Sequence, residues 1–290
     1  MSSPSKAAFR AALVQMCAGR SVARNVSDAL AFIAEAAAQN AGYVQTPECT
    51  TLMEVDTDRL MAETKPEKNN EALAAFCAAA SMRKIWLHIG SMAVKVGERR
   101  LANRSYLIAP DGEIRARYDK IHMFDVDLGN GDVYSESVNY QAGSSAVVAD
   151  LPWGRLGLTI CYDLRFPALH RALAKAGAAF LAGPAAFTRV TGEAHWHTLL
   201  RARAIETGTF VLAAAQGGRH ENGRETFGHS LIIAPWGEVL AEGGTEPGVV
   251  IAEIDPHRID AARSKIPSLT HDRAFEIVEA RPLQLEAIVK

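Results

Sequence analysis

Short runs of strand-forming residues alternate with stretches of helical periodicity along most of this chain. Apolar, β-rich runs occur at residues 8–14, 42–45, 85–94, 105–108, 180–183, 210–215, 230–234 and 248–254. Helical spacing occurs at residues 25–38, 71–82, 167–176 and 195–206. This alternation predicts an α/β protein built in layers. The strand pairs that lack an intervening helix predict antiparallel or mixed sheets.

The two halves of the chain share a short motif. Residues 108–114 read Ile-Ala-Pro-Asp-Gly-Glu-Ile, and residues 233–239 read Ile-Ala-Pro-Trp-Gly-Glu-Val. Each motif predicts a hairpin turn, because proline presets φ and glycine adopts the left-handed conformation. One hairpin in each half suggests two similar αββ units that close into one sandwich, although two common turns would give the same pattern.

No proline- or glycine-rich linker interrupts this pattern, so the 290 residues predict a single domain. We assign residues 1–270 to that domain. Residues 271–290 mix apolar and charged side chains after the globular pattern has ended. This composition predicts a tail that packs on a partner subunit or frays.

Composition argues against several classes of function. With 31 basic and 33 acidic residues the net charge is −2, which gives no general attraction to nucleic acid or to anionic membranes. No segment approaches the roughly 20 apolar residues that span a bilayer, and residues 1–6 run into a strand without an apolar signal core. No glycine-rich phosphate loop follows a strand, so neither a nucleotide nor another cofactor is expected.

The cysteine pattern points to a reducing compartment. Four cysteines in a chain of this length are too few for a disulfide scaffold, and no pair has metal-ligand spacing. The sequence therefore predicts a cytoplasmic protein without a bound metal. His195 and His197 would lie on different faces of their predicted helix, which argues against shared metal binding.

Cys161 is the first candidate for chemistry. It ends the apolar run 156–160 and precedes Tyr-Asp-Leu-Arg-Phe and Pro167, a residue suited to open a helix. A thiol at such a strand-to-helix turn would lie at the carboxyl end of a sheet strand, where α/β proteins build their sites. The N–H groups of a starting helix would favour a thiolate. A buried structural cysteine is an equally good interpretation of Cys161 alone.

A cysteine nucleophile needs a proton acceptor and a group that stabilises the oxyanion. No histidine stands in a pattern typical of that acceptor. Glu48 ends a short strand, where desolvation would raise its pKa and make it a better proton carrier. Lys120 follows another strand and, close to the thiol, would lower the thiol pKa and bind an oxyanion. Either residue alone is more often a solvated surface group.

Three ordered motifs together resemble the nitrilase superfamily of carbon–nitrogen hydrolases. They are Pro47-Glu48, Asp119-Lys120-Ile121-His122 and the segment 160–167 around Cys161, and the resemblance runs from about residue 9 to residue 266. It implies a carbon–nitrogen hydrolase domain folded as a four-layer αββα sandwich with two mixed β-sheets, usually a homodimer or higher homo-oligomer, and a Glu–Lys–Cys triad. It also implies a second glutamate, for which Glu136 is the candidate, in a polar rim loop at residues 127–143.

The resemblance implies hydrolysis of a small linear amide through a cysteine thioester, with release of ammonia. The N–H of Tyr162 would bind the oxyanion together with Lys120. Arg165 would either fork onto a substrate carboxylate or pair with an acidic neighbour such as Asp163. The remaining candidates for lining the same cleft are Phe187 and Thr191.

Residues 120–127 and 194–196 are most similar to the superfamily branch that contains deaminated glutathione amidase and omega-amidase. A small carboxylated amide is therefore the expected partner, with deaminated glutathione first and 2-oxoglutaramate second. N-carbamoyl amino acids and nitriles remain alternatives, because one triad serves all of these reactions. A catalytically silent scaffold subunit is the alternative from another functional class.

Overall fold

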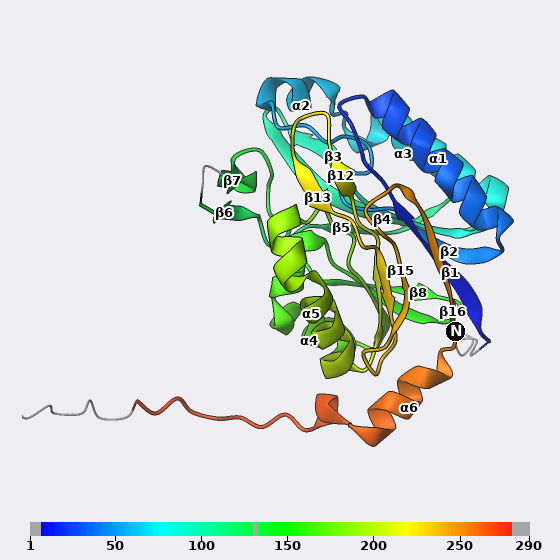
Figure 1. Cartoon of the computed structure of the whole chain (residues 1–290), viewed down its shortest axis with the longest axis vertical. Coiled ribbons are helices and arrows are strands. Elements are labelled where there is room, and N and C mark those ends of the chain that lie inside the picture. The colour runs from blue at the N-terminus through cyan, green and yellow to red at the C-terminus, as the bar shows by residue number, and fades with distance from the viewer. Residues whose placement is uncertain (1–6, 130–132, 280–290) are drawn as a thin grey trace, which may run out of the picture.

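The structure is a computed structural model that describes residues 7–129 and 133–279. Two six-stranded mixed sheets lie face to face, and a pair of helices covers the outer side of each (Figure 1). The predicted αββα sandwich is thus confirmed. No helix in the described part of the chain is both long enough and apolar enough to span a membrane.

The first sheet has the strand order β16-β1-β2-β3-β4-β5. Its strands are β1 (Phe9–Gln15), β2 (Ala41–Gln45), β3 (Trp86–Gly97), β4 (Arg100–Ile108), β5 (Ile114–Asp119) and β16 (Gly248–Ile254). Strand β2 is parallel to both β1 and β3, and the other neighbours are antiparallel. The two outer helices of this half are α1 (Val22–Ala38) and α3 (Glu71–Arg83). Each lies between two parallel strands in the sequence, as a crossover connection requires.

The second sheet repeats this plan in the order β8-β9-β10-β11-β14-β15. Its strands are β8 (Val147–Leu151), β9 (Gly154–Leu158), β10 (Ala178–Ala182), β11 (Phe210–Ala213), β14 (Leu231–Ile233) and β15 (Val239–Glu242). Its outer helices are α4 (Pro167–Lys175) and α5 (Arg189–Thr207). From β16 to β5 and from β8 to β15, both sheets run antiparallel, parallel, parallel, antiparallel, antiparallel. The two halves are therefore similar units, as the shared motif suggested.

The shared motif forms the predicted turns in both sheets. Gly112, between β4 and β5, has a φ of +88°, and Gly237, between β14 and β15, has a φ of +87°. The N–H of each glycine donates to an alanine carbonyl, Ala109 or Ala234, at 2.8 Å. Glycine is favoured at both positions because a side chain is disfavoured at positive φ.

Strand β1 illustrates how the layers pack. Phe9, Ala11 and Leu13 face the core between the two sheets. Ala12 and Val14 face the second core, beneath α1 and α3. Successive side chains of a strand point to opposite faces, so a strand buried on both sides needs a continuous apolar run. This arrangement explains why residues 8–14 lack alternating polarity.

Two small ribbons and several short helices connect these layers. The ribbons are β6 (Asp125–Asp127) with β7 (Val133–Ser135), and β12 (Gly217–Arg219) with β13 (Glu225–Phe227). The shorter helices include α2 (Thr57–Glu63), η1 (Glu67–Asn69), η2 (Glu136–Val138) and η3 (Cys161–Arg165). The expected rim loop thus contains paired strands, which project from the sandwich in Figure 1. Its residues 130–132 lie outside the described chain.

The carboxyl-terminal segment leaves the sandwich after α6 (His257–Lys265) and η4 (Ser268–Thr270). Residues 271–279 are exposed and have no regular secondary structure. Asp272 forms ion pairs with Arg171 and Lys175 of α4. Residues 280–290 of the predicted tail lie outside the described chain.

Candidate active site

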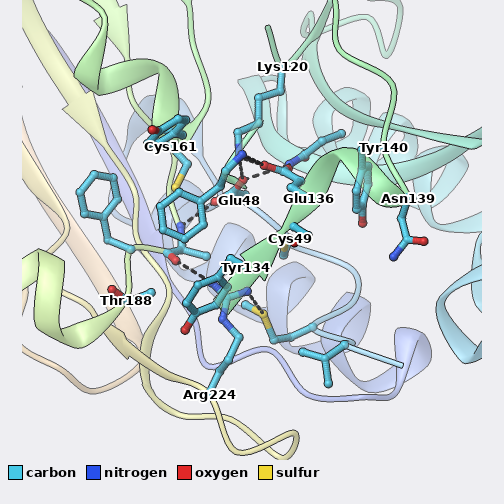
Figure 2. Close-up of a pocket in the computed structure, with 18 of the residues that line it drawn as sticks. Glu48, Cys49, Lys120, Tyr134, Glu136, Asn139, Tyr140, Cys161, Thr188 and Arg224 are labelled. Carbon is cyan, nitrogen blue, oxygen red and sulfur yellow. Dashed lines mark hydrogen bonds and ion pairs between the residues drawn. The ribbon is translucent and has the colours of Figure 1, made fainter. Parts of the chain in front are cut away.

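Four side chains from separate chain segments meet in one pocket (Figure 2). The Lys120 Nζ donates hydrogen bonds to Glu48 Oε1 at 2.9 Å and to Glu136 Oε2 at 2.8 Å. The thiol of Cys161 donates a hydrogen bond to Glu48. Lys120 is 2% exposed and Glu48 is 4% exposed, so neither is a solvated surface group. The structure therefore brings together the thiol, the ammonium group and both carboxylates that the sequence singled out.

Asn103 holds the two carboxylates at a fixed separation. Its Nδ2 lies 3.0 Å from Glu48 Oε1 and 3.0 Å from Glu136 Oε1. Backbone N–H groups complete the coordination, from Ala186 to Glu48 Oε2 at 2.9 Å and from Phe124 to Glu136 Oε2 at 2.8 Å. Sequence analysis missed Asn103, whose only signal is an amide side chain within the mostly buried strand β4.

Cys161 lies three residues beyond β9, at the first position of the short 3₁₀ helix η3. Its φ is +49°, a left-handed conformation that costs a non-glycine residue about 1–2 kcal/mol. Its N–H donates to the carbonyl of Pro184 at 2.8 Å. The predicted turn is present, but the α-helix that follows begins only at Pro167. The helix that starts at the thiol is therefore the short η3, and Pro167 opens the α-helix as predicted.

Asp163 ties this turn to the segment that carries Lys120. The carboxylate is fully buried. It accepts a hydrogen bond from the Tyr118 hydroxyl at 2.7 Å and lies 2.7 Å from Nδ1 of His122. It also accepts hydrogen bonds from the backbone N–H of His122 at 3.1 Å and from that of Ile160, the residue before Cys161, at 2.9 Å. Asp163 thus fixes the ammonium-bearing segment against the thiol-bearing turn.

The charges in the cluster place the resting proton on sulfur. Burial alone would raise the pKa of Glu48, but the Lys120 ammonium and the hydrogen bonds from Cys161 and Lys120 lower it below its ordinary value. Burial and the Glu48 carboxylate raise the pKa of the Cys161 thiol well above its ordinary value. Both directions are opposite to the sequence-based expectation. The reason is that Lys120 neutralises only one of two carboxylates, so a thiolate would add a second net negative charge.

We expect Glu48→Gln to lower the pKa of Cys161. The carboxylate raises that pKa through its charge and by accepting the S–H hydrogen bond, and glutamine removes the charge while keeping the shape. Thiolate should then form at a lower pH, although amide turnover is lost. The measurement is ultraviolet thiolate absorbance against pH, with the signal of Cys161→Ala subtracted in each background, with and without Glu48→Gln, to remove the other three cysteines. An unchanged or higher midpoint in the glutamine variant would contradict this charge arrangement.

The four residues predicted to bind substrate all line the same pocket, a cavity of about 250 Å³; they are Tyr162, Arg165, Phe187 and Thr191. The Arg165 guanidinium lies 5.3 Å from the centre of the Phe187 ring, and its Nη1 is 3.2 Å from Nδ1 of His195. Asp163 is fully engaged elsewhere, and none of the ion pairs in the described part of the chain joins it to Arg165. Of the two alternatives for Arg165, the pairing with Asp163 is therefore excluded.

Sequence reasoning also missed other residues of the pocket lining, among them Tyr134, Arg224 and Cys49. Tyr134 lies on β7, and the Arg224 guanidinium lies 5.2 Å from the centre of its ring. Burial and the neighbouring Glu48 carboxylate raise the pKa of Cys49 to about 12. Arg224 gave no pattern because its segment, residues 217–228, contains four glycines and reads as a loop.

One group in the described part of the chain has the composition of a metal site, and it lies apart from the pocket lining. His197, His229 and Glu242 bring their ligand atoms within 4.8 Å of one another. Glu242 Oε1 lies 2.9 Å from Nε2 of His197 and 2.7 Å from Nδ1 of His229. His195 contacts Arg165 instead, so the two histidines of this helix have separate partners, as expected.

An αββα sandwich with a buried thiol, ammonium and carboxylate cluster defines a class, the sandwich-fold hydrolases of carbon–nitrogen bonds. The family model described as Carbon-nitrogen hydrolase matches residues 10–264. This chain therefore belongs to the carbon–nitrogen hydrolase family, within the nitrilase superfamily. It is a hydrolase that acts on carbon–nitrogen bonds other than peptide bonds.

Named relatives and a solved structure agree with this assignment. A protein named deaminated glutathione amidase from Synechocystis sp. is 40% identical over 267 residues, 91% of this chain and 97% of the relative. Omega-amidase NIT2 from Homo sapiens is 35% identical over 267 residues, 92% of this chain and 95% of the relative. The crystal structure of Saccharomyces cerevisiae Nit3, described as a member of branch 10 of the nitrilase superfamily, has a TM-score of 0.83. It is 29% identical, and the match covers 92% of this chain and 97% of that chain.

Proposed function

We propose that this enzyme hydrolyses small carboxylated linear amides through a thioester on Cys161. Glu48 carries the proton, and Lys120 binds the oxyanion. The observation that carries this proposal is the buried cluster in which one carboxylate, Glu48, accepts hydrogen bonds from both the Cys161 thiol and the Lys120 ammonium group. In that geometry the nucleophile, its base and its electrostatic partner are already in contact before substrate enters.

Acylation needs one proton to move twice. As sulfur bonds to the amide carbon, the thiol proton passes to Glu48, and the carbonyl oxygen becomes an oxyanion held by Lys120 and the N–H of Tyr162. Glu48 then gives that proton to the nitrogen while the carbon–nitrogen bond breaks. A primary amide releases ammonia, and a substituted amide releases an amine. A protonated Cys161 beside an ionised Glu48 is the correct starting state for this sequence.

Deacylation uses the same carboxylate in reverse. Glu48 takes a proton from water, the resulting hydroxide adds to the thioester carbon, and the carbon–sulfur bond breaks as sulfur recovers the proton. The carboxylic acid product then leaves. Glu136 keeps Lys120 in place through its 2.8 Å hydrogen bond and, at the pocket wall, can orient the incoming water.

The pocket supports an acidic substrate. Arg165 lines the pocket and has no carboxylate partner among the described residues. Its guanidinium can therefore pair with a carboxylate of the substrate. The names of the relatives support deaminated glutathione as the first candidate and 2-oxoglutaramate as the second. For deaminated glutathione the leaving group is the amine of cysteinylglycine, and for 2-oxoglutaramate it is ammonia.

The test is a comparison of kcat/KM for deaminated glutathione, 2-oxoglutaramate, carbamoyl amino acids, simple nitriles, and the methyl ester of 2-oxoglutaramate. We expect the two carboxylated amides to be the best substrates. The ester should have a higher KM because it cannot pair with Arg165. The hydrolysis product is quantified for every compound, because primary amides, carbamoyl amino acids and nitriles release ammonia but deaminated glutathione releases an amine. Turnover of nitriles alone would overturn the substrate class, and no turnover at all would favour the scaffold-subunit alternative.

We also propose that the chain works as a homodimer or higher homo-oligomer in the cytoplasm, with residues 1–270 as the catalytic domain. The segment 271–290 would lie at a subunit interface. Its described part exposes Phe275, Ile277 and Val278 by 84–88%, a density of apolar surface typical of a contact site. Sedimentation of the full chain and of a chain ending at residue 270 would test the interface: an unchanged oligomer excludes it.

A further inference from the structure

We propose that Arg224 binds a second substrate carboxylate, located on the amine side of the scissile amide. This inference rests on the proposed amidase function and deepens it. It makes the preferred substrate an amide whose leaving amine is itself anionic. An unsubstituted primary amide would bypass Arg224 altogether.

The guanidinium of Arg224 is poorly satisfied within the protein. Its Nη2 donates to the carbonyl of Ala186 at 3.3 Å, and its Nη1 lies 3.8 Å from the sulfur of Met53, a weak acceptor. Its Nε is the single buried side-chain nitrogen or oxygen without a hydrogen-bond partner in the part of the chain that the structure describes. Leaving such a donor unpaired costs about 1–3 kcal/mol, so the arrangement indicates a ligand-binding role.

Two guanidinium groups that line the pocket have no carboxylate within ion-pair distance among the described residues. Lys120 is neutralised by Glu48 and Glu136. Neither Arg165 nor Arg224 forms an ion pair with a carboxylate among residues 7–129 and 133–279, yet both line the pocket. Both side chains are partly buried, and a partly buried guanidinium that lines a pocket is well placed to bind an anionic ligand. Two separate carboxylates on one substrate would supply both partners.

The position of Arg224 indicates that it binds the amine side of the substrate. Glu48 must reach the leaving nitrogen, because it delivers the proton to it. Ala186 joins the two residues, since its N–H donates to Glu48 Oε2 at 2.9 Å and its carbonyl accepts from Arg224. Figure 2 draws Arg224 with Tyr134 at the opposite side of the pocket from Lys120, which would hold the carbonyl oxygen. A substrate carboxylate that binds Arg224 therefore belongs to the part of the substrate beyond the leaving nitrogen.

Arg165 fits the acyl side for a complementary reason. It belongs to η3, the same short helix that begins at Cys161, four residues earlier in the chain. The acyl group remains bonded to that cysteine after the amine departs. A carboxylate on the acyl group would stay with Arg165, and a carboxylate on the amine would leave from Arg224.

The experiment compares two amides that differ only beyond the nitrogen, 2-oxoglutaramate and its N-carboxymethyl derivative. A charge-assisted hydrogen bond contributes about 1.5–3 kcal/mol, which corresponds to about a 10- to 150-fold change. We expect Arg224→Gln to lower kcat/KM for the N-carboxymethyl amide by that factor relative to 2-oxoglutaramate. Arg224→Lys should retain part of the preference. Arg219→Gln is the matched control, because Arg219 is exposed at the end of neighbouring strand β12, outside the pocket lining.

The ratio between the two substrates separates the possible outcomes. An equal loss for both amides would mean that Arg224 acts through Glu48 or through the fold, and would overturn the proposal. No loss for either amide would also overturn the proposal. If wild type turns over neither amide, the proposed function fails. Calorimetric binding of the N-carboxymethyl amide to Cys161→Ala, with and without Arg224→Gln, then tests Arg224 separately. Equal affinities in that pair would also overturn the inference.

Discussion

Cys161→Ala is expected to abolish amide hydrolysis, with kcat lowered by on the order of 10⁴-fold or more. The variant has no atom that can form the thioester, and loss of a covalent nucleophile is among the largest single-residue effects in enzymes. Stability should change little, because a small side chain replaces a thiol in a cavity already open to substrate. The measurement is kcat for the best amide together with thermal unfolding of both proteins.

The control for this prediction is Cys77→Ala. Cys77 lies on α3, is half-buried and is outside the pocket lining, so the same chemical change is made at a distant site. Its activity should match that of wild type. Residual turnover in Cys161→Ala at the level of the control would mean that another group attacks the amide.

Lys120→Met is expected to reduce both activity and stability. Loss of one oxyanion donor lowers kcat by about 10²- to 10³-fold. The substitution also leaves two carboxylates, the buried Glu48 and the partly buried Glu136, without their cation. Breaking a buried charge cluster in this way costs about 3–5 kcal/mol of unfolding free energy. Steady-state kinetics and urea unfolding measure the two effects.

A second substitution separates these two effects of Lys120. Adding Glu136→Gln to Lys120→Met removes one of the uncompensated charges and should restore part of the lost stability, while turnover remains low. Lys68→Met is the surface control, because Lys68 is exposed on η1. If the double variant regains activity along with stability, Lys120 is structural and the oxyanion role is wrong.

The layers of the fold follow from local patterns in the sequence. Strand β16 begins and ends at the predicted residues, and α4 begins at the predicted Pro167. Both are bounded by strong signals, an apolar run and a proline at the first helical position. The start of α5 at Arg189 was missed by six residues. Its cap, Thr188, accepts a weak bond from the N–H of Thr191 at 3.3 Å and has no distinctive neighbours in the sequence.

The residues of the candidate site could be nominated from the sequence, but their protonation states could not be predicted. Cys161, Glu48 and Lys120 follow separate strands, so their residue types and order were sufficient to nominate them. The proton's location was not predictable, because it depends on a third charge, Glu136, whose distance from Lys120 only the fold determines. Arg224 was missed for a different reason. It enters the pocket from a ribbon whose sequence has no apolar period.

The most direct measurement of the central claim is the mass of the protein during turnover. A carboxylated amide is mixed with wild type or with Glu48→Gln, the reaction is quenched in acid within one turnover, and the intact protein and its peptides are weighed. The account predicts an added acyl group, equal in mass to the product acid less one water, on the peptide that contains Cys161. An adduct on Cys49 instead, or turnover by wild type with no adduct at any quench time, would contradict it.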